Sequence, residues 1–239
     1  MKSHTGMCLL FSLALLLSAG ARGATTQTAD LGEELFDVRL PSFEIRNGTL
    51  FRGIARLSAE TAQLSFAFEF ALTEHFHDSP VPKASLSIHL DNKTIREALT
   101  ALCNADGHYT WTRDGTTINV YPKETVGDGS YLMNRRLPRL ELKDAPTAQD
   151  AMFGAVAQLP PPFEQIAFAQ AGGNTRFPMP LRARFENLTL RQALNLIARN
   201  IAPRAGWVLS GSREFRTVGF HDRQIQEEPA NSEQTGKSF

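Results

Sequence analysis

A ten-residue phrase occurs twice in this chain, 95 positions apart. Residues 90–99 read LDNKTIREAL, and residues 185–194 read FENLTLRQAL. A repeat at this distance is too long for one unit of a solenoid and close to the size of a small domain. The phrase therefore predicts two copies of one domain in tandem. The identical positions are Asn92/Asn187, Thr94/Thr189, Arg96/Arg191, Ala98/Ala193 and Leu99/Leu194.

The N-terminus has the pattern of an export signal. Lys2 precedes an apolar run at residues 7–18, MCLLFSLALLLS, and Ala19-Gly20-Ala21 offers a small-residue cleavage site. The run has the length of a signal-peptide core and is too short to cross a bilayer as a helix. The alternative is a short buried helix. We expect residues 1–21 to be removed and the mature protein to be periplasmic, without a transmembrane span. Association with an outer-membrane complex is a further expectation.

Cleavage would leave one cysteine, Cys103, because Cys8 lies inside the apolar run. A single cysteine cannot form a disulfide within the chain, which suits a bacterial periplasm better than a disulfide-rich extracellular domain. Cys103 falls near the end of an expected amphipathic helix. We expect it to be a small buried apolar residue, with a reactive thiol as the alternative.

The charges are balanced overall but unevenly distributed. Residues 30–130 carry 15 acidic and 9 basic side chains, whereas residues 131–223 carry 7 acidic and 13 basic ones. Two solvated surfaces that mildly attract each other would have this distribution. A basic second domain that meets an anionic partner would have it too, since complementary charge steers association.

Hydrophobic periodicity predicts an ordered series of elements in the first copy. Alternation in LSFAFEF, residues 64–70, predicts a half-buried strand. Thr94 and Glu97 form a capping box at the start of a helix that Gly107 ends. The other expected elements are a strand at 43–46, a helix at 50–62, a strand through Leu86, Ile88 and Leu90, and a hairpin at 108–121 with Asp114-Gly115 at its tip.

The second copy repeats this order. Thr189 and Gln192 repeat the capping box, and Leu190, Ala193, Leu194 and Ile197 repeat the apolar stripe of the helix. The other expected elements are a strand at 140–143, a helix at 147–159, a strand at 164–170, a strand whose inward residues are Leu181, Ala183 and Phe185, and a hairpin at 207–220. The fold class is therefore α+β, with two small tandem β-α-β-β-α-β-β sandwich domains after a cleaved signal peptide.

At residues 43–121 these elements resemble the secretin and TonB short N-terminal (STN) domain family. The similarity lies in FEIR, LFRGIARLS, LSFAFEF, LSIHLDNKTIREALTALCNADGHYTW and TINVYP. Residues 139–221 resemble a more divergent copy, in which Gln192 replaces the family's Glu, Pro203 falls at the end of the second helix and Pro160-Pro161-Pro162 follow the first. The places of the family's recurring phrase are occupied by Thr94, Glu97, Ala98, Leu99, Gly107 and Ile118.

The resemblance implies docking or signalling modules rather than catalysts. Domains of this family are α+β sandwiches at the periplasmic end of secretins and of some TonB-dependent outer-membrane receptors. On this reading the partner is an envelope protein, either a secretion component, a TonB-dependent receptor or an anti-sigma component. The expected domains are a signal peptide at 1–21, a linker at 22–38, STN-like domains at 39–122 and 139–221 joined by a linker at 123–138, and a disordered tail at 222–239.

One cluster of metal-ligating residue types occurs, at Glu74-His75-Phe76-His77-Asp78. In an extended segment His75 and His77 would face one way, and Asp78 or His89 could be a third ligand. Solvated histidines in a proline-containing loop are the more ordinary reading. The sequence contains no nucleophile elbow, P-loop or dinucleotide fingerprint. We therefore expect no catalytic residues, no cofactor and no metal.

Three Asn-x-Thr sequences start at Asn47, Asn92 and Asn187. They match the glycosylation sequon, but each directly precedes an expected helix, where Asn suits a turn and Thr suits an N-cap. We favour the structural role.

The hypotheses that remain differ in class. The first is a non-catalytic docking module. The alternatives are a metal-binding protein or enzyme that uses residues 74–78, and a cell-envelope assembly protein that binds peptidoglycan or anionic lipid. We do not expect nucleic-acid binding, because the aromatic residues of the basic second copy have core-like spacing. These residues are Phe185, Trp207, Phe215 and Phe220.

Overall fold

The computed structural model describes residues 33–61, 63–72, 85–161, 166–169, 175–212 and 215–221. The expected signal peptide, the cluster at residues 74–78 and the expected tail at 222–239 lie outside these residues. The described chain mixes helices and strands and is an α+β fold. Within it, no helix is long and apolar enough to span a membrane.

The same order of elements occurs twice, in a first half at residues 39–122 and a second half at residues 136–221. The first half contains β1 (Arg39–Gly48), α2 (Leu50–Glu60), β2 (Ser65–Glu69), β3 (Leu86–Thr94), α3 (Ile95–Asp106), β4 (Tyr109–Asp114) and β5 (Thr117–Pro122). The second half contains β6 (Arg136–Thr147), α4 (Ala148–Val156), β7 (Ile166–Ala169), β8 (Arg176–Thr189), α5 (Leu190–Ile201), β9 (Gly206–Gly211) and β10 (Arg216–His221).

The two halves share one six-stranded sheet, in the order β4-β5-β2-β9-β10-β7. We expected each half to close a sandwich of its own, and this expectation was wrong. The free edge of β2 pairs in parallel with β9, which turns two three-stranded sheets into one. The pairs β1–β3 and β6–β8 remain separate two-stranded sheets.

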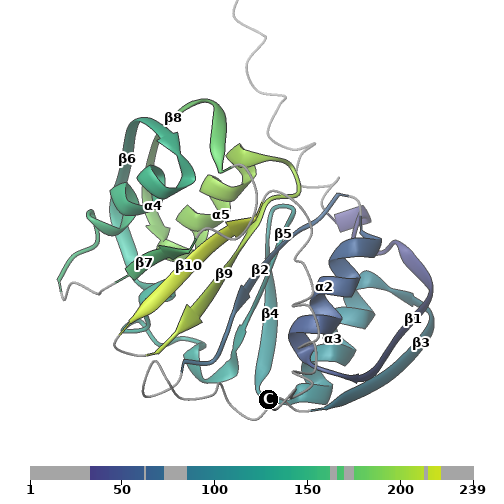
Figure 1. Ribbon diagram of the computed structural model, residues 1–239. Helices are drawn as coiled ribbons and strands as arrows, with labels where there is room; N and C mark the ends of the chain where they lie inside the picture. Colours follow the sequence, from purple (N-terminus) through teal and green to yellow (C-terminus); the bar gives the residue numbers. More distant parts are fainter. Residues whose placement is uncertain are drawn as a thin grey trace, which may run out of the picture.

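The strand directions explain how the halves are related. In each group of three, the first two strands are antiparallel and the next two are parallel. Because β2 and β9 are themselves parallel, β9-β10-β7 keeps the order of β4-β5-β2 but runs in the opposite direction. A rotation of 180° about an axis that lies in the sheet, perpendicular to the strands, combined with a shift along that axis, relates two such groups. This rotation exchanges the two faces of the sheet. Figure 1 shows α2 and α3 on one side of the sheet and α4 and α5 on the other.

Each half therefore has its own hydrophobic core, on its own face of the sheet. We call these the first core and the second core. Phe66 and Phe68 of β2 belong to the first core, whereas Ala67 between them belongs to the second. Successive residues of a strand point to opposite faces, so β2 serves both. The half-buried strand expected here is wrong, because all five residues of β2 are buried.

The Asn-x-Thr sequences act as helix starts, as expected. Asn47, Asn92 and Asn187 have φ of 50°, 51° and 57°, the left-handed conformation that Asn tolerates better than most residues. The hydroxyl of the Thr two positions later accepts a hydrogen bond from a backbone N–H of the first helical turn. Both predicted capping boxes, at Thr94 and at Thr189, are confirmed.

The segments expected to be linkers contribute to the cores. Phe36 is buried in the first core, and Leu132 and Met133 are buried in the second. Short 3₁₀ helices at Lys123–Thr125 and Leu132–Asn134 lie within residues 123–138, and β6 already begins at Arg136. One aromatic residue or two apolar residues do not form the periodic pattern that predicts a helix or strand. Their burial is nevertheless enough to pack a segment against a core.

Two aromatic residues of the second half are not core residues. Phe185, expected to face inward on β8, is 41% exposed, and Phe215 is 38% exposed. Trp207 and Phe220 are fully buried, as their spacing predicted. Phe185 lies opposite Leu140 on β6, which is fully buried.

Gly206 lets β9 approach β2 closely. A Cβ built at this position would lie 1.9 Å from the backbone oxygen of Phe66. We predict that Gly206→Ala lowers the free energy of unfolding by about 1–3 kcal/mol, because one of the two strands must shift. Gly129→Ala is the matched control, since a Cβ there meets nothing within 4 Å. Urea denaturation measures both, and an equal loss in the two variants would contradict the role given to Gly206.

Cys103 is a buried member of the first core, as expected. Burial, and then the charge of Asp106, raises the pKa of its thiol to about 12. With Cys8 replaced by alanine, we predict that Cys103 reacts with a thiol reagent at pH 8 only as fast as the protein unfolds, since the thiolate is the reactive form. Rapid labelling in native buffer, before any denaturant is added, would contradict this.

Candidate functional site

The residue types that the sequence singled out for metal binding do not meet in the described part of the chain. His89 is exposed on β3, and its Nε2 lies 3.0 Å from a carboxylate oxygen of Asp91. His75, His77, Glu74 and Asp78 lie outside the described residues. Within the described ranges, no three His, Cys, Asp or Glu side chains are grouped as metal ligands.

The most unusual polar site is the junction between the halves. Glu69, the last residue of β2, is 1% exposed. Arg191, from the first turn of α5, binds it with two nitrogens: Nε lies 2.5 Å from Oε1, and a terminal nitrogen lies 3.1 Å from Oε2. This paired geometry is the strong form of an arginine–carboxylate contact. The two side chains come from positions 122 residues apart in the chain, one from each half.

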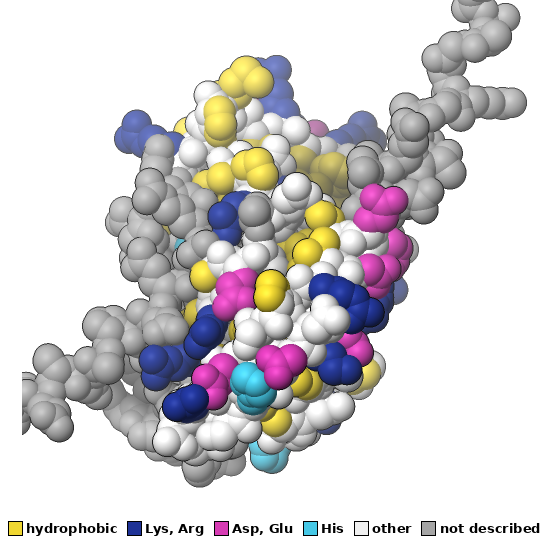
Figure 2. Space-filling model, turned by 90° about the vertical axis from the view of Figure 1, so that its right-hand side faces the viewer, with side chains coloured by type: hydrophobic (Ala, Val, Ile, Leu, Met, Phe, Trp, Pro, Cys, Tyr) yellow, Lys and Arg dark blue, Asp and Glu magenta, His cyan; other side chains and the backbone are white. Residues whose placement is uncertain are grey.

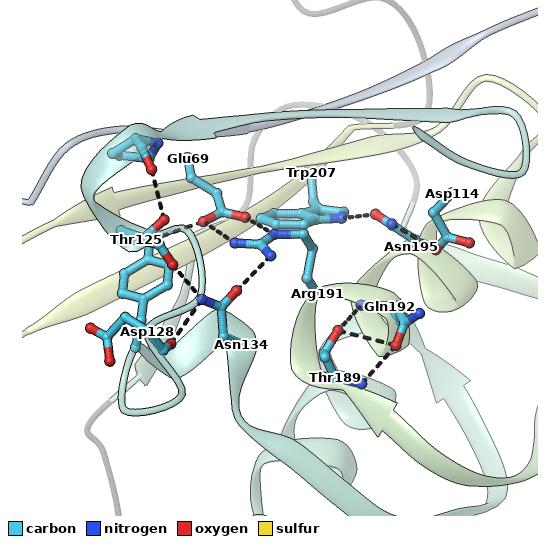
Figure 3. Close-up of polar contacts among 12 residues, drawn as sticks. Glu69, Asp114, Thr125, Asp128, Asn134, Thr189, Arg191, Gln192, Asn195 and Trp207 are labelled. Atoms are coloured by element: carbon cyan, nitrogen blue, oxygen red, sulfur yellow. Dashed lines mark hydrogen bonds and ion pairs between the residues drawn. The ribbon is translucent and has the colours of Figure 1, made fainter. Parts of the chain in front are cut away.

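The connection between the halves completes this site. The hydroxyl of Tyr131 donates to Glu69 over 2.9 Å, and the other terminal nitrogen of Arg191 donates to the side-chain oxygen of Asn134 over 2.7 Å. Asn134 in turn donates to the backbone oxygens of Thr125 and Asp128. Figure 3 shows Glu69 and Arg191 at the centre of this set of contacts. We call Glu69, Tyr131, Asn134 and Arg191 the junction network.

The electrostatics of the network favour fixed protonation states. Burial opposes the charged form of Arg191, but Glu69 and then the neighbouring tyrosines outweigh it and raise the pKa of Arg191. Burial, followed by the Glu69 carboxylate, raises the pKa of Tyr131, so its hydroxyl stays protonated as a donor. The guanidinium also lies over the ring of Tyr121 at 4.2 Å from the centroid. Donors and acceptors are matched, which is what a buried charge pair requires.

A second set of contacts joins α5 to the tip of the β4–β5 hairpin. The indole nitrogen of Trp207 donates to the side-chain oxygen of Asn195 over 2.7 Å, and the Asn195 amide donates to Asp114 over 2.9 Å. Arg199 donates to the backbone oxygen of Asp114 over 3.0 Å. Since Asp114 belongs to the first half, α5 is held against both halves of the sheet.

The junction lies in the middle of the six-stranded sheet, between its two terminal strands. β4 and β7 are the ends of the six-stranded sheet, and each pairs with a neighbour on one side only in the described structure. Terminal strands present backbone donors and acceptors to which another strand can add. They are the most promising binding surfaces of the described chain.

The outer face of β1 and β3 has a different character. Figure 2 looks onto this side of the molecule and shows acidic and basic side chains interspersed with small apolar patches. Several are paired with each other, including Arg46 with Glu44 and Lys93 with Glu97. A surface of this composition is typical of a solvated face.

No protein-family model, curated protein or solved structure matches this chain. The resemblance of residues 43–121 to the STN domain family therefore stays a prediction.

The sequence did not reveal the junction network. Arg191 is identical in both copies of the repeated phrase, but its counterpart Arg96 contacts Glu33 on the surface instead. Glu69 occupies the polar side of an alternating strand, where a solvated carboxylate is the ordinary expectation. Ser65 and Ala67, which alternate with the phenylalanines before Glu69, are small enough to leave room for a second layer, but small residues suit a solvated surface equally well.

The repeated arginines provide an internal test of the ion pair. We predict that Arg191→Met lowers the free energy of unfolding by about 3–5 kcal/mol, because Glu69 is left buried without a counter-charge. Arg96→Met, the same change at the exposed equivalent, should cost within about 1 kcal/mol. Urea denaturation measures both.

A double variant separates pairing from packing. Glu69→Met with Arg191→Met removes both charges, so its loss should be clearly smaller than the sum of the two single losses. Additive losses would contradict a direct energetic coupling between these side chains.

Proposed function

We propose that this protein is an exported, periplasmic docking module made of two tandem STN-like units, and that it binds an envelope protein through the ends of its shared sheet. The role is non-catalytic. The envelope partner is a secretion component, a TonB-dependent receptor or an anti-sigma component. The signal-like N-terminus and the resemblance of residues 43–121 support the location and the class of partner.

The observation that carries this proposal is a sheet whose centre is paired and buried and whose two ends are open in the described chain. The middle of the sheet is closed by the β2–β9 pair and the junction network, whereas the ends, β4 and β7, each keep one edge without a paired strand in the described chain. Strand addition at such an edge supplies affinity through main-chain hydrogen bonds and specificity through alternate side chains.

Edge variants test docking. Thr112→Lys on β4 and Ala167→Lys on β7 each place a long charged side chain on a terminal strand, a common device against strand addition. Asn200→Lys adds the same charge to an exposed position on α5 and is the control. We predict that an envelope protein captured from a periplasmic extract by the unchanged protein is retained by the Asn200 variant. One of the two edge variants should lose it at least tenfold.

Capture that survives both edge variants would refute docking through the sheet ends. Failure of the unchanged protein to retain any envelope protein above a blank matrix would refute the docking role itself.

A further inference from the structure

We propose that the ends of the sheet also join copies of this chain head to tail, with β7 of one copy paired in parallel with β4 of the next. This contact would have the strand directions and register of the β2–β9 junction, at a wider strand spacing. The inference rests on the proposed docking role of the sheet ends and names a second copy of the chain as one occupant.

The two ends are equivalent to the two strands that already pair inside the molecule. By element order, β7 is the counterpart of β2, and β4 is the counterpart of β9. Each trio also has the same strand order and the same pairing senses. The internal contact joins β2, the last strand of the first trio, to β9, the first strand of the second trio. Their counterparts, β7 and β4, lie at the two ends of the sheet, each with one edge unpaired in the described chain.

Side-chain contacts fix the equivalence of β4 and β9. The indole nitrogen of Trp111 donates to Thr100 on α3, as that of Trp207 donates to Asn195 on α5. Thr100 and Asn195 are 95 positions apart, the spacing of the repeated phrase. Trp111 is therefore the counterpart of Trp207.

The pairing tables then give the register of the contact between copies. Trp111 lies opposite Val120, and Trp207 lies opposite Phe220, so Val120 and Phe220 are counterparts. Phe68 pairs with Val120 and Ala169 with Gly219, which makes Ala67 the counterpart of Ala169. Since Ala67 lies opposite Trp207 inside the molecule, Ala169 is expected opposite Trp111 of the next copy. Phe168 then lies opposite Thr110. Thr110 stands at the position of Gly206 and carries a Cβ, so β4 and β7 must lie farther apart here than β9 and β2 do.

This geometry makes an open chain rather than a closed dimer. One half-turn relates the first half to the second, so two successive half-turns bring the next copy back to the original orientation. The contact is heterologous, because it uses a different edge on each partner, and such contacts extend unless a rotation closes them.

The uneven charge of the chain supports this arrangement and bears on the affinity of the contact between copies. The contact places the second half, with 13 basic and 7 acidic side chains at residues 131–223, beside the first half, with 15 acidic and 9 basic ones at residues 30–130. Opposite charge favours the encounter and makes it weaken with salt. In this register residue 171, an alanine, corresponds to Glu69, so the contact lacks the ion pair of the internal junction and should be reversible.

Two single-cysteine proteins test the register. Both are expressed from the full-length sequence with Cys8 and Cys103 replaced by alanine, and one carries Thr110→Cys while the other carries Phe168→Cys. We predict that a short bifunctional thiol reagent links them when they are mixed at low salt, and that the yield falls at least fivefold in high salt. Neither protein alone should be linked to itself, because positions 110 and 168 meet only between β4 and β7.

Efficient linking of either protein alone would indicate a two-fold contact and overturn the head-to-tail arrangement. Absence of linking in a mixture of folded proteins would overturn the association. A partner captured from periplasm through one edge would still uphold the docking role in that case, so the two ideas fail separately.

Sedimentation gives a second reading that does not depend on the Phe168 variant. The unchanged protein should increase in average mass with concentration at low salt, and the Thr112→Lys and Ala167→Lys variants should each remain monomeric. A mixture of these two variants retains one intact β4 edge and one intact β7 edge, so it should form dimers and nothing larger. A mixture that stays monomeric, or variants that assemble like the unchanged protein, would contradict the proposal.

Discussion

The fold depends on one buried contact between its halves, the pairing of β2 with β9 and the Glu69–Arg191 ion pair beside it. A carboxylate that is 1% exposed would be strongly destabilising without its partner. Here it receives two nitrogens of Arg191 and the hydroxyl of Tyr131. Because the three groups come from the first half, the second half and the connection between them, the contact exists only when all three parts are in place.

The repeat explains why one sequence motif has two roles. Arg96 and Arg191 stand at the same position of the repeated phrase, at the start of equivalent helices. Arg191 faces the neighbouring half and becomes buried, whereas Arg96 stands at the end of the sheet and pairs with Glu33 with 45% of its side chain exposed. The two arginines differ because of where their halves lie in the sheet. The second half has the first half beside Arg191, whereas the first half has no neighbouring half beside Arg96.

The local elements could be predicted from the sequence, and the junction could not. The capping boxes at Thr94 and Thr189, the turn at Asp114-Gly115 and the apolar stripe of α5 follow from contacts within a few residues. The pairing of β2 with β9 joins residues about 140 positions apart, and alternation in LSFAFEF reports only that one side of the strand is apolar. Ser65, Ala67 and Glu69 gave the appearance of a solvent-facing row because small residues suit a surface as well as a second core.

Differential scanning calorimetry tests the central claim, that the halves form one cooperative unit. The predicted result is a single transition in which the calorimetric enthalpy equals the van't Hoff enthalpy, because loss of either half exposes β2 or β9 and breaks the buried ion pair. Two transitions, or a calorimetric enthalpy near twice the van't Hoff value, would show that the halves unfold independently and would contradict the account.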